Sequence, residues 1–146
     1  MTARERIHAT CVALENGAVL LRGPSGSGKS DLALRLIDRG ASLVADDQTL
    51  IERREGGLVA FAPSTIAGQM EVRGLGLVSV PFLETAPLRL VVDLVDLPPE
   101  RLPDPETVDI LGVMLPLLRL RGFEASAPAK LRLAVREALR AKEINK

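Results

Sequence analysis

Close to its amino terminus the chain carries the sequence Gly23-Pro24-Ser25-Gly26-Ser27-Gly28-Lys29-Ser30. It matches the whole pattern of a phosphate-binding loop: glycine, four free positions, glycine, lysine, then serine or threonine. Glycines let the backbone turn tightly, so that successive N–H groups can surround a polyphosphate. In this pattern Lys29 reaches the terminal phosphates, and the hydroxyl group of Ser30 is a ligand of Mg²⁺. The sequence therefore predicts a nucleotide-binding site formed by residues 23–30.

The residues on both sides of the loop support this match. Gly17–Arg22 is a short apolar run, typical of a buried strand. Asp31–Arg39 has apolar side chains at a spacing of four, which predicts a helix, and Gly40 suits a left-handed residue after its end. Strand, glycine loop and helix follow in the order that the motif requires. The alternative, a glycine-rich surface turn, does not require this order.

The composition narrows the class of protein. A length of 146 residues suits a single domain, so we expect residues 1–146 to form one. Hydrophobic residues make up 47% of the chain and aromatic residues 2%, which predicts an aliphatic core. The 19 basic and 19 acidic residues cancel, and aromatic side chains for base stacking are scarce, so we expect no nucleic-acid partner.

We also expect no membrane association. No apolar stretch is long enough to cross a bilayer, and the first residues have no signal-peptide core behind them. The single cysteine, Cys11, lies in an apolar run, where a small core residue is the simplest interpretation. A nucleotide loop, one cysteine and no export signal together predict a cytoplasmic protein.

Ile7–Leu14 is predicted to form one strand, which Glu15-Asn16-Gly17 would connect as a hairpin to the strand before the loop. Strand alternation places Ile7, Ala9, Cys11 and Ala13 on one face and His8, Thr10, Val12 and Leu14 on the other. The hairpin would bring His8, the only histidine, near the phosphates. The simpler alternative is a histidine hydrogen-bonded at a sheet edge.

Ala41–Asp47 predicts a short strand that ends in two carboxylates. Phosphate-loop enzymes often place an acid at such a strand end, beside the metal and the terminal phosphate. Because neighbours in a strand face opposite sides, Asp46 and Asp47 share one site only if the strand has ended; otherwise their roles are separate. The alternative is a solvated turn.

The rest of the chain predicts further strands and a final helix. The expected elements are a hairpin of Gln48–Arg53 and Leu58–Phe61, a helical or irregular connector at Ala62–Gln69, a core strand at Leu88–Val95, two strands or one kinked strand at Thr107–Leu111 and Val113–Leu120, and a helix from Ala127 to about Glu143.

Two further segments have open interpretations. Residues 70–81 suit either a loop followed by a strand or an irregular segment in which Glu71 and Arg73 face metal and phosphate. Leu97–Pro105 is a proline-rich, exposed connection whose only basic residue is Arg101, which by itself suggests a solvated loop arginine.

Four separated segments resemble the catalytic domain of HPr kinase/phosphorylase, the bacterial enzyme that phosphorylates a serine of the phosphocarrier protein HPr. They are the phosphate loop, His8 at its distance before the loop, Leu43-Val44-Ala45-Asp46-Asp47, and Glu71-Val72-Arg73-Gly74-Leu75-Gly76, which is similar to the family signature. The resemblance extends from about Ile7 to the last helix. It implies an α/β fold with a mixed sheet around the phosphate loop, similar to the nucleotide-binding core of phosphoenolpyruvate carboxykinase, and a hexameric assembly.

The resemblance also implies a role for each matching residue. Lys29 would hold the transferring phosphate, and Ser30 and Glu71 would be magnesium ligands. Asp47 would be the general base toward the serine hydroxyl and the acid in the reverse reaction. His8 would lie near the phosphates, and Arg101, in Glu100-Arg101-Leu102, would correspond to an arginine in a mobile loop that stabilises transferred charge. Arg73 and Gly74 of the signature are expected to contact the nucleotide.

The implied function is phosphorylation of HPr or an HPr-like phosphocarrier protein, with ATP as donor and Mg²⁺ as the metal. The alternatives are a small-molecule kinase with the same loop and a non-catalytic nucleotide sensor. The signature argues against the small-molecule kinase, and the double aspartate argues against the sensor.

The chain departs from the family in two places. Better-known members have an additional amino-terminal domain, whereas this chain resembles a short form that consists of the catalytic domain. Where the family has a Gly-Arg-Asn segment linked to dephosphorylation, this chain has Pro116–Glu124, in which Arg119 and Arg121 are the substitutes available. The kinase direction is therefore the main expectation, and phosphorolysis, which uses inorganic phosphate and releases pyrophosphate, is the second.

Overall fold

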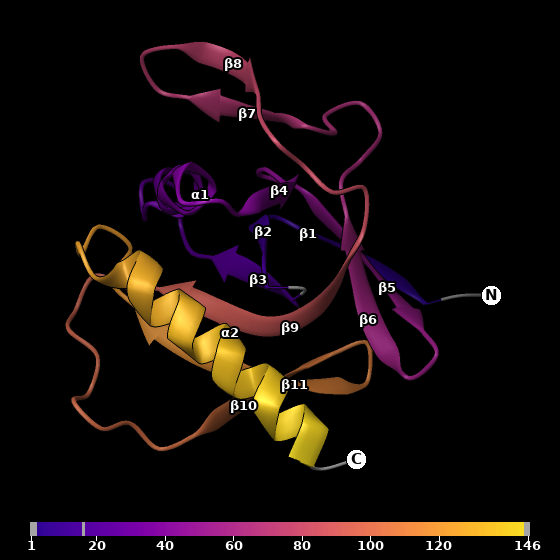
Figure 1. Cartoon of the computed structure of the whole chain (residues 1–146), viewed down its shortest axis with the longest axis vertical. Helices are drawn as coiled ribbons and strands as arrows, with labels where there is room; N and C mark the ends of the chain where they lie inside the picture. The colour runs from indigo at the N-terminus through magenta and orange to yellow at the C-terminus, as the bar shows by residue number, and fades with distance from the viewer. Residues whose placement is uncertain (1–2, 16, 145–146) are drawn as a thin grey trace.

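The structure is a computed structural model that describes residues 3–15 and 17–144. Its elements are β1 (Arg4–Ile7), β2 (Thr10–Leu14), β3 (Gly17–Arg22), α1 (Lys29–Asp38), β4 (Ser42–Ala45), β5 (Thr49–Arg54), β6 (Gly57–Phe61), β7 (Gln69–Val72), β8 (Gly76–Ser79), β9 (Ala86–Leu94), β10 (Glu106–Ile110), β11 (Val113–Leu120) and α2 (Ala127–Ile144). Figure 1 shows a curled sheet with both helices packed on it and the β7–β8 hairpin projecting beyond α1.

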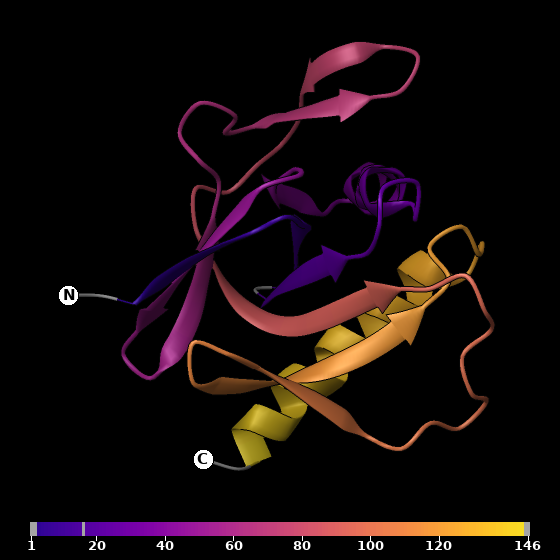
Figure 2. The same ribbon diagram turned by 180° about the vertical axis from the view of Figure 1, so that it is seen from behind.

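Strand β9 joins the two halves of the sheet. Its first residues pair with β6 antiparallel, and its later residues lie parallel to β3 on one side and to β11 on the other. Strand β3 in turn pairs antiparallel with β2, so the sheet is mixed, as expected. The carboxyl ends of β3, β9 and β11 therefore lie side by side at one edge (Figure 2). The phosphate loop leaves the sheet at this edge.

Helix α1 begins directly after the loop and has one buried face. Leu32, Ala33 and Leu36 pack into the core, as the spacing of four predicts. The helix ends where Gly40 takes a φ of 100°. The N–H of Gly40 donates to the carbonyl of Ile37, and that of Ala41 donates to the carbonyl of Leu36, both at 3.0 Å. These two hydrogen bonds satisfy carbonyl groups in the last turn of the helix. The predicted helix end at Gly40 is therefore confirmed.

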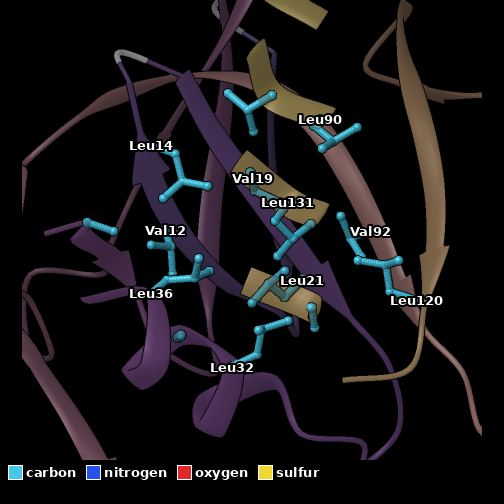
Figure 3. Packing of buried hydrophobic residues seen from close by; sticks show 14 of the residues in the cluster. Val12, Leu14, Val19, Leu21, Leu32, Leu36, Leu90, Val92, Leu120 and Leu131 are labelled. Atoms are coloured by element: carbon cyan, nitrogen blue, oxygen red, sulfur yellow. The ribbon is translucent and has the colours of Figure 1, made fainter. Parts of the chain in front are cut away.

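Two apolar clusters cover the two faces of the sheet. The first lies between the sheet and the helices, and Figure 3 shows its members Val12, Leu14, Val19, Leu21, Leu32, Leu36, Leu90, Val92, Leu120 and Leu131. The second cluster fills the inside of the curl and includes Ala9, Cys11, Leu20, Ile51 and Val91. Residues of β3 alternate between the clusters because successive side chains of a strand point to opposite faces. Burial raises the pKa of the Cys11 thiol, in agreement with its predicted place in the core.

The single strand predicted at Ile7–Leu14 is wrong. The chain bends at His8 and Ala9, so that β1 pairs with β5 while β2 pairs with β3 and β4. At this bend the chain passes from one half of the curled sheet to the other. The alternation of apolar residues does not predict the bend, because it depends on which distant strands β1 and β2 pair with. The predicted faces are nevertheless confirmed, because Ala9, Cys11 and Ala13 belong to the second cluster and Val12 and Leu14 to the first.

The predicted hairpin between Ile7–Leu14 and Gly17–Arg22 is confirmed by the antiparallel pairing of β2 and β3. Asn16 of its expected turn lies outside the described residues. Residues 69–79 form the β7–β8 hairpin rather than an irregular segment or a loop before a single strand.

The predicted hairpin of β5 and β6 is also confirmed, and β10 and β11 are two paired strands. Each pair is joined by two residues with positive φ, Glu55-Gly56 and Leu111-Gly112. Such turns match the twist of the strands that they connect. Among the described residues, neither helix contains a stretch long and apolar enough to cross a membrane.

A matched pair of substitutions tests how α2 packs on the sheet. Leu131 is fully buried, whereas Leu133, two residues later on the same helix, is 58% exposed. We expect Leu131→Ala to lower the free energy of unfolding by about 2–5 kcal/mol because it leaves a cavity. Leu133→Ala should change it by less than about 0.5 kcal/mol. Urea unfolding of both variants measures the difference, and equal losses would contradict this packing of α2.

Candidate active site

The phosphate loop between β3 and α1 depends on glycine at defined positions. Gly26 and Gly28 have φ values of 86° and 101°, which favour glycine. A Cβ atom at Gly28 would lie 3.1 Å from Cζ of Phe123, and one at Gly23 would lie 2.6 Å from Oγ of Ser27. The loop is closed by a hydrogen bond from the N–H of Ser27 to the carbonyl of Pro24 at 3.0 Å. The glycines therefore permit both the turn and the close approach of neighbouring groups.

Lys29 is the first residue of α1, and its side chain turns back over the loop. The ammonium group donates to the carbonyl oxygen of Gly23 at 2.5 Å and to that of Pro24 at 3.2 Å. The N-terminus of α1 adds the positive end of the helix dipole at the same place. A lysine held across a loop of backbone N–H groups, in front of a helix N-terminus, is an arrangement suited to binding phosphate.

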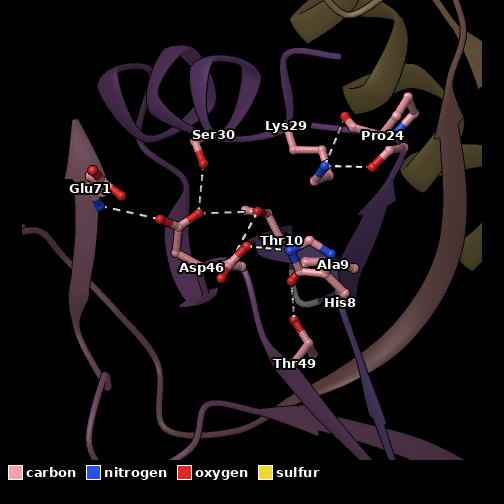
Figure 4. A network of polar contacts seen from close by, with 11 residues as sticks. His8, Ala9, Thr10, Pro24, Lys29, Ser30, Asp46, Thr49 and Glu71 are labelled. Carbon is pink, nitrogen blue, oxygen red and sulfur yellow. Dashed lines mark hydrogen bonds and ion pairs between the residues drawn. The ribbon is translucent and has the colours of Figure 1, made fainter. Parts of the chain in front are cut away.

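Asp46 lies at the centre of a polar network beside the loop (Figure 4). Its Oδ1 accepts hydrogen bonds from the hydroxyl groups of Ser30 at 2.8 Å and Thr10 at 3.1 Å. Its Oδ2 accepts one from the N–H of Glu71 at 3.2 Å. Asp46 is only 7% exposed, so these donors replace the water that its carboxylate has lost. This one side chain therefore connects β4 to α1, β2 and β7.

Asp47 has different surroundings from its neighbour. Strand β4 ends at Ala45, and Asp47 has a φ of 68°, so its side chain does not continue the strand alternation. Its Oδ1 lies 2.5 Å from Nε2 of His8, and the two side chains are 66% and 61% exposed. Its N–H donates to Oγ1 of Thr10 at 3.3 Å. The strand has thus ended before the two aspartates, and they also differ in burial: Asp46 is buried and Asp47 is exposed to solvent.

Glu71, Arg73 and Gly74 lie on the β7–β8 hairpin. The hairpin packs against α1, and the backbone of Glu71 is joined to Asp46 as described. The side chain of Glu71 is exposed, and Arg73 and Gly74 occupy the exposed turn of the hairpin. The structure thus brings Glu71 to the site through its backbone, but it gives no contact of Arg73 or Gly74 with the loop.

Arg101 is not brought to the site. It is exposed in the irregular connection between β9 and β10, which runs away from α1 along one edge of the molecule (Figure 1). Arg119 forms an ion pair with Glu106 at 2.8 Å on the neighbouring strand. Hydrogen bonds from Arg119 hold the pKa of Glu106 below its usual value. This pairing occupies the guanidinium group of Arg119.

The oxygen groups of the site fit a magnesium ion. A hydroxyl group and carboxylates are the hard donors that Mg²⁺ prefers, and it commonly uses one or two carboxylates together with substrate phosphates. Within the described part of the chain, no group of three or more His, Cys, Asp or Glu side chains is arranged to hold a metal. Ser30, with Asp46 and Glu71 beside it, therefore suits a metal that is bound jointly with phosphate.

Sequence reasoning missed two residues of this site. Asp46 was considered only as part of the acidic pair, and Thr10 was given no role. A signal for Thr10 was present, because strand alternation put its hydroxyl group on the same face as His8. Strand alternation alone did not distinguish Asp46 from Asp47, which only the family resemblance separated, because the difference depends on the backbone conformation at Asp47.

Comparison with known proteins finds one matching family model, which describes the HPr serine kinase C-terminal domain and covers residues 1–121. The chain is 38% identical to an HPr kinase/phosphorylase of Burkholderia lata over 152 residues, 96% of this chain and 46% of that protein. It is 40% identical to one of Chlorobium phaeobacteroides over 129 residues, 80% of this chain and 38% of that protein. The chain thus spans less than half the length of these curated relatives.

A solved structure is also similar. It is that of the HPr(Ser) kinase/phosphatase from Coxiella burnetii, with a TM-score of 0.82 and 28% sequence identity. The match covers 95% of this chain and 99% of that chain. The curled mixed sheet described above is therefore shared with this protein.

Substitution of each aspartate in turn tests their different surroundings. We expect Asp46→Asn to lower the free energy of unfolding by about 1–3 kcal/mol, because the new amide group places a donor where three donors converge. Asp47→Asn should change it by less than about 0.5 kcal/mol, because that side chain is exposed. Urea unfolding without nucleotide measures both, and equal effects would contradict the network around Asp46.

Proposed function

Because the chain belongs to the family of the HPr serine kinase C-terminal domain, we propose that it transfers the terminal phosphate of ATP to a serine of HPr or an HPr-like phosphocarrier protein. The family resemblance inferred from the sequence is confirmed by these comparisons. The family membership is a finding, whereas the phosphorylation of HPr by this chain is proposed. The observation that supports it most directly is the contact between His8 and Asp47, an exposed carboxylate whose neighbour Asp46 is hydrogen-bonded to Ser30 of the phosphate loop.

The proposed reaction is a direct displacement at phosphorus. Asp47 accepts the proton of the serine hydroxyl group as the serine oxygen attacks the terminal phosphorus, and ADP leaves. A hydroxyl group is a weak nucleophile, so a carboxylate within hydrogen-bond reach assists it. His8 holds Asp47 through the 2.5 Å contact and so orients the carboxylate toward the incoming serine. The exposure of both side chains leaves room for a protein substrate.

The loop residues bind and orient the donor. Lys29 and the backbone N–H groups of residues 23–30 hold the phosphates, since phosphoryl transfer depends mainly on positioning and charge neutralisation. Ser30 and Glu71 would hold Mg²⁺, with Asp46 fixing both by its hydrogen bonds. The metal would supply neutralisation of phosphate charge when bound. Arg73 and Gly74 of the hairpin turn and Arg101 of the β9–β10 connection are proposed to contact the nucleotide or the transferred phosphate from segments that move toward the loop.

The reverse reaction would use the same groups. In phosphorolysis, inorganic phosphate takes the phosphate of phosphoserine, pyrophosphate is released, and Asp47 returns its proton to the serine oxygen. The proposal further includes a cytoplasmic location, which rests on the nucleotide loop, the single cysteine and the lack of a recognisable export signal in the sequence. It also includes a hexameric assembly, which rests on the family resemblance.

The mass of HPr tests the kinase reaction. Purified chain is incubated with Mg²⁺, ATP and HPr from the same organism, and the expected product carries one phosphate on a serine. Asp47→Asn should lower the rate by about 10²–10⁴-fold, because the general base is lost, while ATP binding is kept. Phosphoserine-HPr with inorganic phosphate tests the reverse reaction, in which pyrophosphate should appear and the variant should be equally impaired.

Three results would contradict the proposal. Unmodified HPr in the presence of bound ATP would exclude HPr as the substrate. Phosphorylation of a metabolite instead would favour a small-molecule kinase. Tight ATP binding without turnover, unchanged by Asp47→Asn, would favour a nucleotide sensor.

A further inference from the structure

The segment Arg121–Glu124, which follows β11, lies against the phosphate loop. Arg35 of α1 donates hydrogen bonds to the carbonyl groups of Gly122 and Glu124, and it is itself held by Asp31 at 3.0 Å. The approach is close, since a Cβ atom at Gly122 would lie 2.7 Å from the carbonyl oxygen of Ser27. The segment is thus attached both to the loop and to the helix that the loop begins.

Phe123 of this segment lies against the glycine that precedes Lys29. Its ring packs over Gly28, where an added Cβ atom would lie 3.1–3.3 Å from three ring atoms, yet the residue is 66% exposed. The chain contains only three phenylalanines and no tryptophan or tyrosine. The ring of Phe123 therefore has one face on the phosphate loop and leaves much of its surface open to a ligand.

A hollow of about 270 Å³ opens beside this ring. It is lined by Ser27 of the loop, by Val95 and Asp96 after β9, and by residues 121–124. The hydroxyl group of Ser27 is buried and has no hydrogen-bond partner among the residues that the structure describes. The lining thus combines an aromatic ring, the cation of Arg121, the carboxylate of Asp96 and an unsatisfied hydroxyl group, the mixed character typical of small-molecule sites.

The hollow and the acidic residues lie on opposite sides of β3. Asp46 and Asp47 follow β4, which is reached from β3 through β2, whereas the hollow lies at the ends of β9 and β11 on the other side. A polyphosphate that follows the loop across β3, with its terminal phosphate facing Asp47, would lead toward Gly28 and Phe123. The group attached to its other end would then lie beside the hollow.

We propose that the nucleoside of the phosphate donor occupies this hollow, with its base stacked on Phe123; this rests on the proposed use of ATP. Every nucleobase has a flat π-face, and stacking on an aromatic side chain contributes substantially to binding. Arg121 and Asp96 line the hollow and offer a cation for the phosphate next to the sugar and a carboxylate for ribose hydroxyl groups. The segment Arg121–Glu124 is therefore a part of the nucleotide site that lies about 90 residues beyond the loop.

Two donors that differ only in the nucleoside test the proposal by calorimetric titration in the presence of Mg²⁺. ATP carries the nucleoside, and inorganic tripolyphosphate contains the phosphates alone. Phe123→Leu keeps an apolar side chain over Gly28 but removes the aromatic face, so we expect about tenfold weaker binding of ATP and unchanged binding of tripolyphosphate. Phe123→Trp should retain ATP affinity.

The tryptophan variant adds a spectroscopic readout, since it would contain the only tryptophan of the chain. Its fluorescence should change on addition of ATP and stay constant with tripolyphosphate. Equal weakening of both donors by Phe123→Leu would assign the ring to support of the loop and overturn the proposal. Unchanged ATP binding, or wild-type protein that binds tripolyphosphate as tightly as ATP, would overturn it too.

These titrations contain no HPr, so they separate the two proposals. Wild-type protein that binds ATP through Phe123 but leaves HPr unmodified would contradict the proposed function and leave the nucleoside site intact. Active kinase whose ATP affinity does not depend on Phe123 would contradict the nucleoside site alone. Binding of neither donor would overturn both.

Discussion

The site depends on a buried negative charge that must be satisfied by hydrogen bonds. A carboxylate removed from water is costly unless donors surround it, and Asp46 receives three, from Thr10, Ser30 and the backbone of Glu71. These donors belong to β2, α1 and β7, which are distant in the sequence. The hydrogen bonds to this one side chain therefore hold α1 with its phosphate loop, β2 and the β7–β8 hairpin in position relative to one another.

The same hydrogen bonds give the neighbouring residues Asp46 and Asp47 different surroundings. Asp46 accepts hydrogen bonds from its donors, whereas Asp47 is exposed and, among the described residues, is hydrogen-bonded to His8 and, through its backbone N–H, to Thr10. The positive φ of Asp47 turns its side chain away from the direction of its neighbour. Thr10 contributes to the surroundings of both residues, since its hydroxyl group donates to the carboxylate of Asp46 and accepts from the backbone N–H of Asp47. A buried, hydrogen-bonded acid and an exposed acid thus lie side by side.

The sheet topology brings the phosphate loop and the proposed nucleoside hollow to the same edge of the sheet. Parallel pairing of β3, β9 and β11 brings three strand ends to one edge, where ligands of α/β proteins commonly bind. The loop supplies backbone groups from the first strand end, Asp96 follows the second, and Phe123 follows the third. Arg35 then holds the last of these segments against the loop.

The sequence by itself determined the features that arise from local patterns. The loop at residues 23–30, the strand before it, and the helix with its stop at Gly40 follow from motifs whose geometry is set by neighbouring residues, and the family follows from four such motifs taken together. Only the tertiary structure decided the break at His8 and Ala9, the β7–β8 hairpin, the role of Thr10 and Asp46, and the approach of Phe123 to Gly28. Arg101, assigned by resemblance, stayed apart from the site. These outcomes depend on contacts between segments tens of residues apart, which become energetically favourable only when the curled sheet brings them together.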